Sequence, residues 1–504
     1  MSEPQETRTE RKQERIEKPQ ASSSKPRKVY VLGVAFVAVL LLGASFGIMI
    51  SATTPSIPTV IEPGSMVSGY SFVIFKDGST TYARNGSSGA LTYSSISSST
   101  VIQNAIDYIA AHSGGKIFFK LANYTLLTTL TISKAHISID AEPGTVLTSN
   151  DLPLLQAIGH DFDNTTANTL NDIQISNLGF YYNGAEKTGR AIYLHKLQND
   201  KIYQGRISFI NIKIWTHSVI PIVPESWNEA VPTNPDFVGL CVQDVIGGYF
   251  SGVSVSWFGT GIQYDSTWDS TYGCWEQGSH NFYEYATIGY CLRGVQYLKA
   301  FTTCEVWDHP KIMLCSEKGW MGSPLEVEIR SPQFESLDFA DIALYYGGYQ
   351  ITITNGLFSG IGILAPGYWD ICGIYLEYAT EIGGATIENC HFYNVKTAIK
   401  TQKLTLLIGN WYDSGVTNKV VKISPGNVTT INDGYVLNNR GTAAISASTT
   451  VTFYHNMSET PELVLCSFNS TATGAWTWTA TSTEITITVV TSGTYTVYWE
   501  AKSW

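Results

Sequence analysis

The sequence predicts an all-β protein whose central part is a solenoid of short strands. Two short apolar phrases recur through the middle of the chain, which is the pattern of stacked repeats. Only 14% of the 504 residues are charged, against about 25% in an average soluble protein, and Ser, Thr, Asn, Gly and Tyr take their place. A hydrophobic fraction of 44% excludes global disorder. This composition is typical of extracellular β-proteins and argues against a cytosolic enzyme.

Residues 1–28 form a cytoplasmic basic tail with eight Lys/Arg and five Asp/Glu. Residues 29–50 carry no charge, and at about 1.5 Å per residue they are long enough to cross a hydrocarbon core of about 30 Å as a transmembrane helix. The basic residues directly before this span place the N-terminus in the cytoplasm and the body outside the cell, anchored to the cell membrane. A cleavable signal peptide is the alternative. The body is net acidic and has no Lys/Arg cluster, which argues against a nucleic-acid partner.

Several features of the remaining chain fit an extracellular location. Residues 51–94 begin with three prolines, as in an extended stalk, and continue as a leading β segment. The eight cysteines have no CxxC or Cys/His spacing, so no metal site is predicted. They can form disulfides whose pairing the sequence does not give, or serve as small buried hydrophobes. Six N-x-S/T sequons are glycosylation candidates: Asn85, Asn123, Asn164, Asn427, Asn456 and Asn469.

A single helix is predicted before the solenoid, over residues 99–111. Apolar side chains at 102, 105, 106 and 109 share one helical face, and Ser or Thr is available as the N-cap. A Gly-Gly pair then ends the helix. Four short apolar segments follow, separated by turn residues and not by helices, so a βαβ sheet does not fit. These predicted strands are 116–119, 126–132, 137–140 and 146–148.

The middle of the chain repeats two strand-like phrases. The first has an apolar residue, any residue, Asn or Ser, two more residues and a large apolar residue. Its copies begin at Ile175, Phe209, Ile329, Ile353 and Ile387, with a degenerate copy at Ile408. The second phrase, a small residue followed by aliphatics, includes Gly189-Arg-Ala-Ile-Tyr and Gly261-Ile-Gln-Tyr. Two strands per 20–35 residues define one solenoid coil, and Asn at a fixed coil position can form a hydrogen-bonded ladder between coils.

These phrases, the segment IQNAIDYIAAHSGGKIFF and the ANYTL and LTISKAHISID segments after it resemble the pectate lyase-like superfamily. The resemblance covers residues 95–435. It implies a right-handed parallel β-helix with an N-terminal capping helix. A two-sheet sandwich is the alternative fold, but it does not explain repeats at this spacing.

The resemblance also implies a choice of chemistry. Hydrolases of this superfamily need two or three carboxylates on one sheet, but the N-T-D, D-D, G-H-G and R-I-K signatures of the polygalacturonase type are absent. Its lyases hold Ca²⁺ with carboxylates. The lyase-like fragments Val306-Trp-Asp-His and Arg330-Ser-Pro match only part of the lyase patterns. Whether the chain is an enzyme therefore stays open. If it is one, a polysaccharide lyase or glycoside hydrolase is implied, with Ca²⁺ in the lyase version and no other cofactor.

Residues 441–504 have a different pattern, with six short runs that alternate apolar and polar residues. Ser, Thr and Gly separate the runs, which predicts a small antiparallel β-sandwich. The pattern is similar to H-type lectins and to the C-terminal modules of viral fibres. That resemblance implies glycan contact or trimerisation.

The best candidate binding region is 264–309, where 11 of 46 residues are aromatic and acidic residues lie between them. Aromatic rings stack on sugar rings, while carboxylates bind hydroxyls or supply acid and base. The candidate catalytic acids are Asp265, Asp269, Glu276, Glu305 and Asp308. The candidate substrate-binding aromatics are Trp268, Tyr272, Trp275, Tyr283, Tyr285 and Trp307. The alternative is that these aromatic residues fill the solenoid core.

Two functions are therefore open. In the first, a membrane-anchored cell-surface glycoprotein uses its β-helix to bind an extracellular polysaccharide, with or without cleaving it. In the second, the β-helix is the rigid stalk of a non-catalytic adhesive spike, and the C-terminal module makes the glycan contact or assembles a homotrimer.

Overall fold

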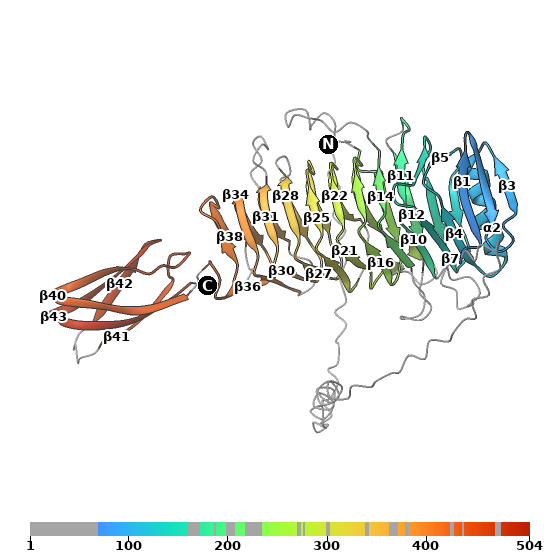
Figure 1. Ribbon diagram of the computed structural model, residues 1–504. Helices are drawn as coiled ribbons and strands as arrows, with labels where there is room; N and C mark the ends of the chain where they lie inside the picture. The colour runs from blue at the N-terminus through green and yellow to red at the C-terminus, as the bar shows by residue number, and fades with distance from the viewer. Residues whose placement is uncertain are drawn as a thin grey trace, which may run out of the picture. The chain divides into compact units, whose positions relative to one another are not determined.

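The computed structural model describes residues 69–159, 172–185, 188–197, 207–216, 234–269, 274–275, 278–298, 303–337, 342–361, 371–377, 383–423, 428–435, 438–468 and 475–503. Its main body is a stack of coils in which three parallel sheets run side by side (Figure 1). Each of the 11 coils gives one strand to sheet A, one to sheet B and one to sheet C, in that order. The parallel β-helix expected from the repeats is confirmed.

Sheet A contains β4 (Gly115–Phe119), β7 (Ile137–Ala141), β10 (Ile173–Ser176), β13 (Ile207–Ile210), β16 (Gly248–Ser251), β21 (Phe282–Glu284), β24 (Glu305–Asp308), β27 (Glu326–Arg330), β30 (Gln350–Thr354), β33 (Gly384–Glu388), β36 (Leu404–Ile408) and β39 (Val428–Ile431). Sheet B contains β5 (Asn123–Leu126), β8 (Val146–Ser149), β11 (Gly179–Tyr182), β14 (Lys213–Trp215), β17 (Ser254–Ser256), β22 (Thr287–Gly289), β25 (Lys311–Met313), β28 (Gln333–Leu337), β31 (Leu357–Ile361), β34 (His391–Val395) and β37 (Trp411–Tyr412). Sheet C contains β6 (Leu130–Ile132), β9 (Leu155–Ile158), β12 (Gly189–His195), β15 (Phe237–Gln243), β18 (Thr260–Asp265), β23 (Arg293–Tyr297), β26 (Lys318–Gly322), β29 (Ile342–Tyr346), β32 (Cys372–Leu376), β35 (Thr397–Thr401) and β38 (Asn418–Lys422).

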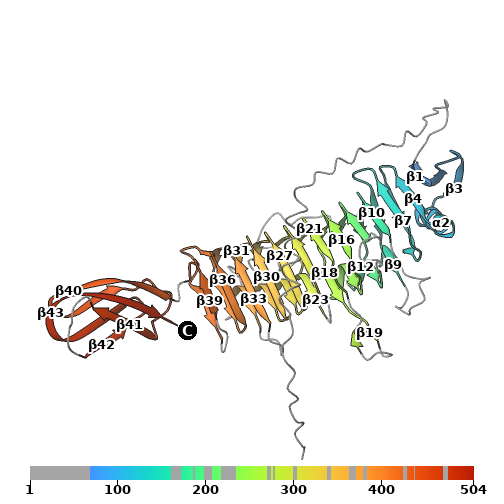
Figure 2. The same ribbon diagram turned by 90° about the horizontal axis from the view of Figure 1, so that it is seen from below.

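The coils differ in length, but the strands keep their register. The first residues of successive sheet A strands lie as few as 20 residues apart, from Gly384 to Leu404, and as many as 41 apart, from Ile207 to Gly248. A short hairpin, β19 (Trp268–Asp269) with β20 (Cys274–Trp275), is inserted between the strands β18 and β21 (Figure 2). Extra residues therefore enter at the corners, and the ladder pairs of the sheets continue across them.

Aromatic stacks fill the interior of the solenoid. In sheet A, Phe209, Phe250, Tyr283 and Trp307 follow one another in register, with ring centroids 5.5, 4.5 and 4.1 Å apart. All four side chains are at most 1% exposed. Parallel, in-register strands place the same inward position of each coil above the next, so large flat rings stack well there.

The asparagine of the first phrase lies at the bend between sheets A and B. Asn177, Asn211, Asn355 and Asn389 all have φ between 52° and 59°, a left-handed conformation that Asn adopts more easily than most residues. The expected ladder is present for one step, where Asn211 Nδ2 donates to Asn177 Oδ1 at 3.0 Å. In the next coil the same bend is made by Gly252, which has no side chain to extend the ladder. The backbone bend therefore explains the recurring Asn better than a continuous amide ladder does.

The helix α2 (Ser98–Ala111) begins at the N-cap Ser97, whose Oγ accepts a hydrogen bond from the Thr100 amide. Its apolar face is buried, and beside it the antiparallel strands β1 (Phe72–Asp77), β2 (Thr80–Asn85) and β3 (Leu91–Ser95) extend sheet A at its N-terminal end. The predicted helix and leading β segment are confirmed, and together they cover the first coil.

The C-terminal module is antiparallel, as expected, and its strands form one hydrogen-bonded sheet that folds back on itself into two layers. It contains β40 (Asn438–Tyr454), β41 (Leu463–Phe468), β42 (Trp476–Ala480) and β43 (Glu484–Lys502). Asn439 Nδ2, near the start of β40, donates to the backbone oxygen of His455, directly after its end, at 2.8 Å, and the Phe453 and Trp499 rings lie 4.8 Å apart. The Ser/Thr/Gly segments read as turns near 447 and 492 lie within the two long strands, where the pairing of β40 with β43 shifts in register and then continues. Bulges at these positions let the two long strands fold back while they stay paired.

The predicted span 29–50, the tail before it and the stalk up to residue 68 lie outside the described residues. Within the part of the chain that the structure describes, no helix has the length and apolarity needed to cross a membrane.

Candidate functional site

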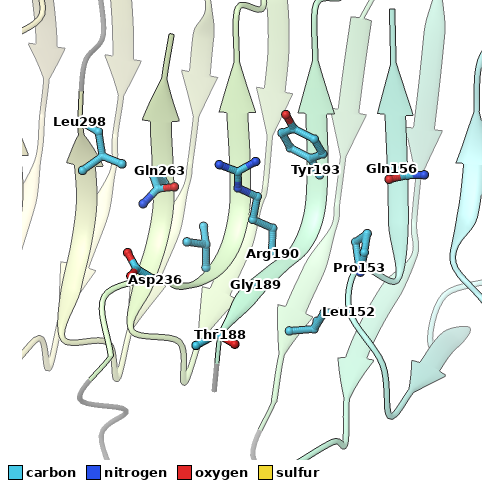
Figure 3. A pocket seen from close by; sticks show the side chains of 11 residues that line it. Leu152, Pro153, Gln156, Thr188, Gly189, Arg190, Tyr193, Asp236, Gln263 and Leu298 are labelled. Atoms are coloured by element: carbon cyan, nitrogen blue, oxygen red, sulfur yellow. The ribbon is translucent and has the colours of Figure 1, made fainter. Parts of the chain in front are cut away.

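The outer face of sheet C carries a groove of about 590 Å³ (Figure 3). Side chains from β9, β12 and β18 line it, together with the turns before β9 and β12. The lining includes Leu152, Pro153, Gln156, Arg190, Tyr193 and Gln263. The groove thus combines one cation, one carboxylate at Asp236, one phenol, two amides and an apolar rim on a rigid sheet.

The strand β12 positions the two central side chains. Ile192 and Leu194 are fully buried in the core, so the alternating residues Tyr193 and His195 point outward. Arg190, near the start of the strand, is also partly exposed, at 33%. The second repeated phrase therefore has an outward, polar side as well as the inward aliphatic side that identified it.

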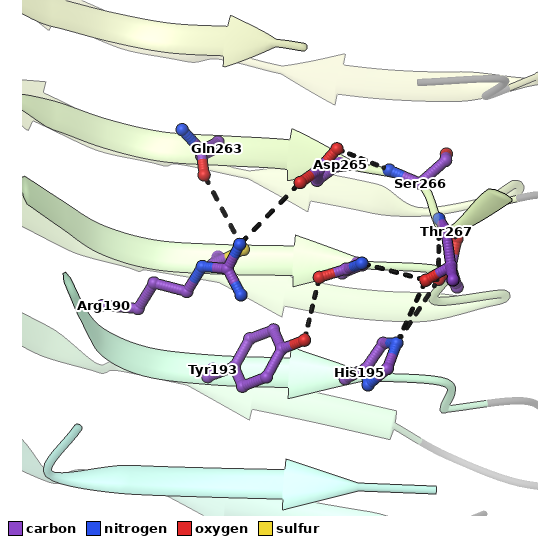
Figure 4. A network of polar contacts seen from close by, with 10 residues as sticks. Arg190, Tyr193, His195, Gln263, Asp265, Ser266 and Thr267 are labelled. Atoms are coloured by element: carbon purple, nitrogen blue, oxygen red, sulfur yellow. Dashed lines mark hydrogen bonds and ion pairs between the residues drawn. The ribbon is translucent and has the colours of Figure 1, made fainter. Parts of the chain in front are cut away.

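Arg190 and Tyr193 form a pair at the centre of the groove. The guanidinium lies over the phenol ring, 4.5 Å from its centroid, and Arg190 Nη2 is 3.8 Å from Asp265 Oδ2 on β18 (Figure 4). Asp265 is held in turn by the Ser266 amide, which donates to its Oδ1 at 2.9 Å. A guanidinium carries five N–H donors, and Asp265 at this distance occupies only part of that capacity.

A buried carboxylate fixes the end of the site beyond Tyr193. The side chain of Asp244 is 0% exposed and lies 3.5 Å from His195 Nε2. Thr267 donates to it from both its hydroxyl, at 2.6 Å, and its backbone amide, at 3.1 and 3.2 Å. Gln243 joins this network by donating to Thr267 Oγ1 at 2.9 Å and accepting from the Tyr193 hydroxyl at 2.8 Å.

The protonation state of Tyr193 follows from its surroundings. Burial raises the pKa of Tyr193 to about 12, although the positive charge of Arg190 acts in the opposite direction. The phenol is therefore neutral at physiological pH, as the hydrogen bond that it donates to Gln243 requires.

The structure separates the residues that the sequence grouped at 264–309. Of the five candidate acids, Asp265 lies on the outer face of sheet C beside the groove. Asp269, Trp268 and Trp275 belong to the inserted hairpin, which is described by its backbone pairing alone. Tyr272 and Glu276 lie outside the described residues.

Glu305, Tyr283 and Trp307, predicted as catalytic or substrate-binding residues, have side chains that lie in the solenoid core at 0 to 1% exposure. For Tyr283 and Trp307 the alternative, that the aromatic residues fill the core, is confirmed. Glu305 Oε1 accepts from Asn281 Nδ2 at 3.0 Å, and Trp307 Nε1 donates to the Tyr297 hydroxyl at 3.1 Å. Burial raises the pKa of Glu305 to about 8. These residues stabilise the core and do not face a ligand.

Asp308 and Tyr285 lie where the sheet A strands β24 and β21 end and the chain bends toward sheet B. They are therefore away from the groove on sheet C. Asp308 Oδ1 is 2.9 Å from His309 Nδ1, and the Tyr285 ring, 56% exposed, lies 5.2 Å from the ring of His309. The five candidate acids therefore do not converge on one face.

Arg190, His195 and Asp244 are not among the residues predicted from the sequence, because they lie outside the dense aromatic and acidic segment at 264–309. The available signal was the polar residue inside the later second phrases, at Gln263 and Gln296. Because the preceding Ile262 and Val295 point inward, alternation places these residues, and Tyr193 in the same register row, on the outer face of sheet C. Alternation does not give the position of Arg190, which lies two residues before the inward Ile192.

Other predicted sites have mixed outcomes. Among the described residues, no group of three His, Cys, Asp or Glu side chains is arranged to hold a metal ion. The cysteines whose side chains are described are unbridged, and five of them are buried like small hydrophobes: Cys241, Cys291, Cys315, Cys372 and Cys390. Of the sequons, Asn123 and Asn456 are exposed and Asn85 is half-buried, whereas Asn164, Asn427 and Asn469 lie outside the described residues.

No protein-family model and no curated protein sequence matches the chain. Among solved structures, it is similar to the Gp54 tailspike of Acinetobacter baumannii bacteriophage AP22, solved with a capsular saccharide, at 11% identity over 79% of this chain and 93% of that one, with a TM-score of 0.40. It is also similar to the A-module of the Azotobacter vinelandii mannuronan C-5 epimerase AlgE6 (12% identity, 66% and 94% coverage, TM-score 0.35). A third match is the Streptococcus pneumoniae surface adhesin PfbA (11% identity, 67% and 88% coverage, TM-score 0.37). At these identities and TM-scores the matches carry no argument about what this chain binds.

Proposed function

We propose that the chain is an extracellular β-helix protein that binds an acidic polysaccharide in the groove on sheet C. The observation that carries this proposal is the Arg190–Tyr193 pair at the centre of the groove. A guanidinium fork matches the geometry of a sugar carboxylate, while the phenol and the amides of Gln156 and Gln263 suit ring carbons and hydroxyls. Because these groups stand on neighbouring strands, binding does not have to order a flexible loop.

Residues 29–50 support a location at the cell surface, since they are long and apolar enough to anchor the body to a membrane. The test is the distribution of the full chain after cell fractionation. Extraction from the membrane fraction by detergent alone supports anchoring. Release by high salt, or secretion without this segment, rejects it.

Isothermal titration against acidic and neutral polysaccharides tests the binding. The full chain is expected to bind the acidic ones, and Arg190→Ala to weaken that binding at least about tenfold, because a charge-assisted pair contributes more than about 1.4 kcal/mol. Lys213→Ala is the matched control, since Lys213 makes a similar cation–π contact, 4.9 Å from the Trp215 ring, but on sheet B. Equal effects of the two variants, or preference for neutral glycans, would reject the groove as an acidic-glycan site.

A version of this function in which the bound polysaccharide is also cleaved is supported by the His195–Asp244 pair beside Tyr193. A histidine held by a buried carboxylate is a suitable proton-transfer group. Reducing ends report hydrolysis and absorbance at 235 nm reports elimination, each measured with and without Ca²⁺. If His195→Gln binds as the parent does and loses turnover, the enzymatic version is supported. A parent protein that binds but produces neither signal makes it a binding protein.

The spike function is favoured by apolar side chains exposed on the C-terminal sheet. Tyr454, Leu465, Val490 and Tyr498 are 49 to 73% exposed, and exposed large apolar side chains can serve as contacts between proteins. We propose that this module assembles the chain into a homotrimer. Light scattering of the full chain measures the mass, and a monomer under conditions where glycan binding persists would reject the trimer.

A further inference from the structure

The far end of sheet C repeats the arrangement of the groove. There, Lys400 Nζ lies over the Tyr375 ring, 5.1 Å from its centroid. Gln402 Nε2 donates to the Tyr375 hydroxyl at 3.3 Å, and the neighbouring Tyr345 hydroxyl donates to Glu377. A cation on a tyrosine ring, an amide on the tyrosine hydroxyl and a carboxylate nearby thus occur at both ends of the same sheet.

Both tyrosines occupy one outward row of that sheet. The register pairs run from Tyr193 through Cys241, Gln263, Gln296, Met321 and Tyr345 to Tyr375, and then to Lys400. Six strand spacings separate the two tyrosines, which is roughly 30 Å at about 4.8 Å per spacing. The second cluster is therefore not part of the groove around Arg190.

The middle of the row separates the two clusters. Between Gln263, which lines the groove, and Tyr345, the row holds only Gln296, which is 4% exposed, and Met321, and neither is charged. Tyr345, Tyr375 and Lys400, by contrast, are each partly exposed, as are Tyr193 and Arg190 at the other end. A ligand thus meets two distinct polar, aromatic and cationic surfaces on one face.

We propose that Lys400, Tyr375 and Tyr345 form a second, separate binding site for a carboxylate-bearing sugar. The ammonium of Lys400 takes the role that the guanidinium has at Arg190, as a point charge in place of a fork. The proposal rests on the proposed function, since it assigns the same ligand class to both clusters. A short acidic oligosaccharide binds either site, whereas one long polysaccharide chain engages both and gains avidity.

Stoichiometry tests the second site. The full chain is titrated calorimetrically with trimers of galacturonic acid and of mannuronic acid, and the parent is expected to bind two equivalents of a trimer that fits. Arg190→Ala and Lys400→Ala should each reduce the stoichiometry to one, and the double variant should abolish binding. Tyr375→Phe, which keeps the ring and loses the hydroxyl to which Gln402 donates, is a milder second variant expected to weaken one site several-fold. Lys213→Ala is the control, with both sites intact.

The outcomes separate the two proposals. In one outcome, the parent binds one trimer per chain in a way that Arg190→Ala abolishes and Lys400→Ala leaves unchanged. That result supports the groove and overturns the second site. One equivalent that depends on Lys400 alone supports the second site and overturns the groove. Binding of neither trimer by the parent overturns both. For long polymers, loss of either cluster should weaken binding at least about tenfold through lost avidity. If each substitution weakens the affinity only slightly and the two effects simply add in the double variant, one polysaccharide chain does not engage both sites.

Discussion

Replacing Glu305 by glutamine is expected to remove most of the pH dependence of the solenoid's stability between about pH 5 and 8. The Glu305 side chain is 0% exposed, and its Oε2 has no hydrogen-bond partner among the described residues. Burial is the main cause that raises its pKa from 4.5 to about 8. The folded state therefore holds a neutral acid over a pH range in which the unfolded chain holds a carboxylate.

The direction and size of the effect follow from proton linkage. Between the two pKa values the unfolded state binds fewer protons than the folded state, so the free energy of unfolding falls as pH rises. The stabilisation is complete below about pH 4.5 and is lost by about pH 8. The slope is about 1.4 kcal/mol per pH unit, so the loss over the window is on the order of a few kcal/mol.

Glutamine keeps the shape and removes the titration. Its Oε1 can still accept from Asn281 Nδ2, the bond that Glu305 Oε1 now accepts at 3.0 Å. Its amide can donate to the hydroxyls of Tyr264 and Tyr283, which are buried and have no partner among the described residues. E305Q is therefore expected to match or exceed the parent in stability at pH 8.

Guanidinium unfolding of the full chain, followed by tryptophan fluorescence at pH 5, 6.5 and 8, measures this effect. The parent's midpoint should fall with pH relative to that of E305Q. The control is Glu335→Gln on the outer face of sheet B, where Glu335 Oε2 pairs with Lys311 at 3.2 Å and is partly exposed. Parallel pH profiles for the parent and E305Q would refute the account of a buried neutral acid, as would a parent that becomes more stable toward pH 8.

Three further substitutions test how the fold is held together, each by denaturant unfolding. Trp307→Ala should cost about 3–5 kcal/mol because it empties a buried position against Tyr283, and a cost below about 1 kcal/mol would contradict the stacked core. Asn355→Ala should cost about 1 kcal/mol because its φ is 55°, while Asn355→Gly should be nearly neutral; equal costs would contradict the backbone explanation. Ser97→Ala should cost about 1 kcal/mol by removing the N-cap of α2, and Ser97→Asp should restore it, whereas an unchanged midpoint for Ser97→Ala would contradict the cap.

The coil architecture could be predicted from the sequence because its signals are local. Each Ile-x-Asn phrase marks a strand and the left-handed bend after it, as at Asn177 and Asn389. The helix α2 was predicted within one residue of its observed start because its apolar spacing and cap are also local. These features depend on neighbours in the chain and not on the length of the connecting loops.

The candidate site could not be predicted in the same way. Inward and outward residues alternate along a strand, so which residues face outward depends on where the alternation begins. A shift of one residue exchanges the inner and outer faces, and coil lengths that vary from 20 to 41 residues break any fixed count. The sequence therefore predicts Glu305 as a catalytic acid and Trp307 as a substrate-binding aromatic residue, although both side chains lie in the core. In the C-terminal module only the strand boundaries differ from the prediction, because the polar Ser/Thr segments form bulges within the long strands β40 and β43.

The uneven coils suggest how such a protein changes over evolutionary time. Because each coil contacts mainly its two neighbours, a coil can be duplicated or deleted with little disturbance to the others. Each such event between β12 and β29 moves Arg190 and Lys400 apart or together by one strand spacing of about 4.8 Å. The spacing between the two proposed sites can therefore change only by whole coils, in steps of about 4.8 Å.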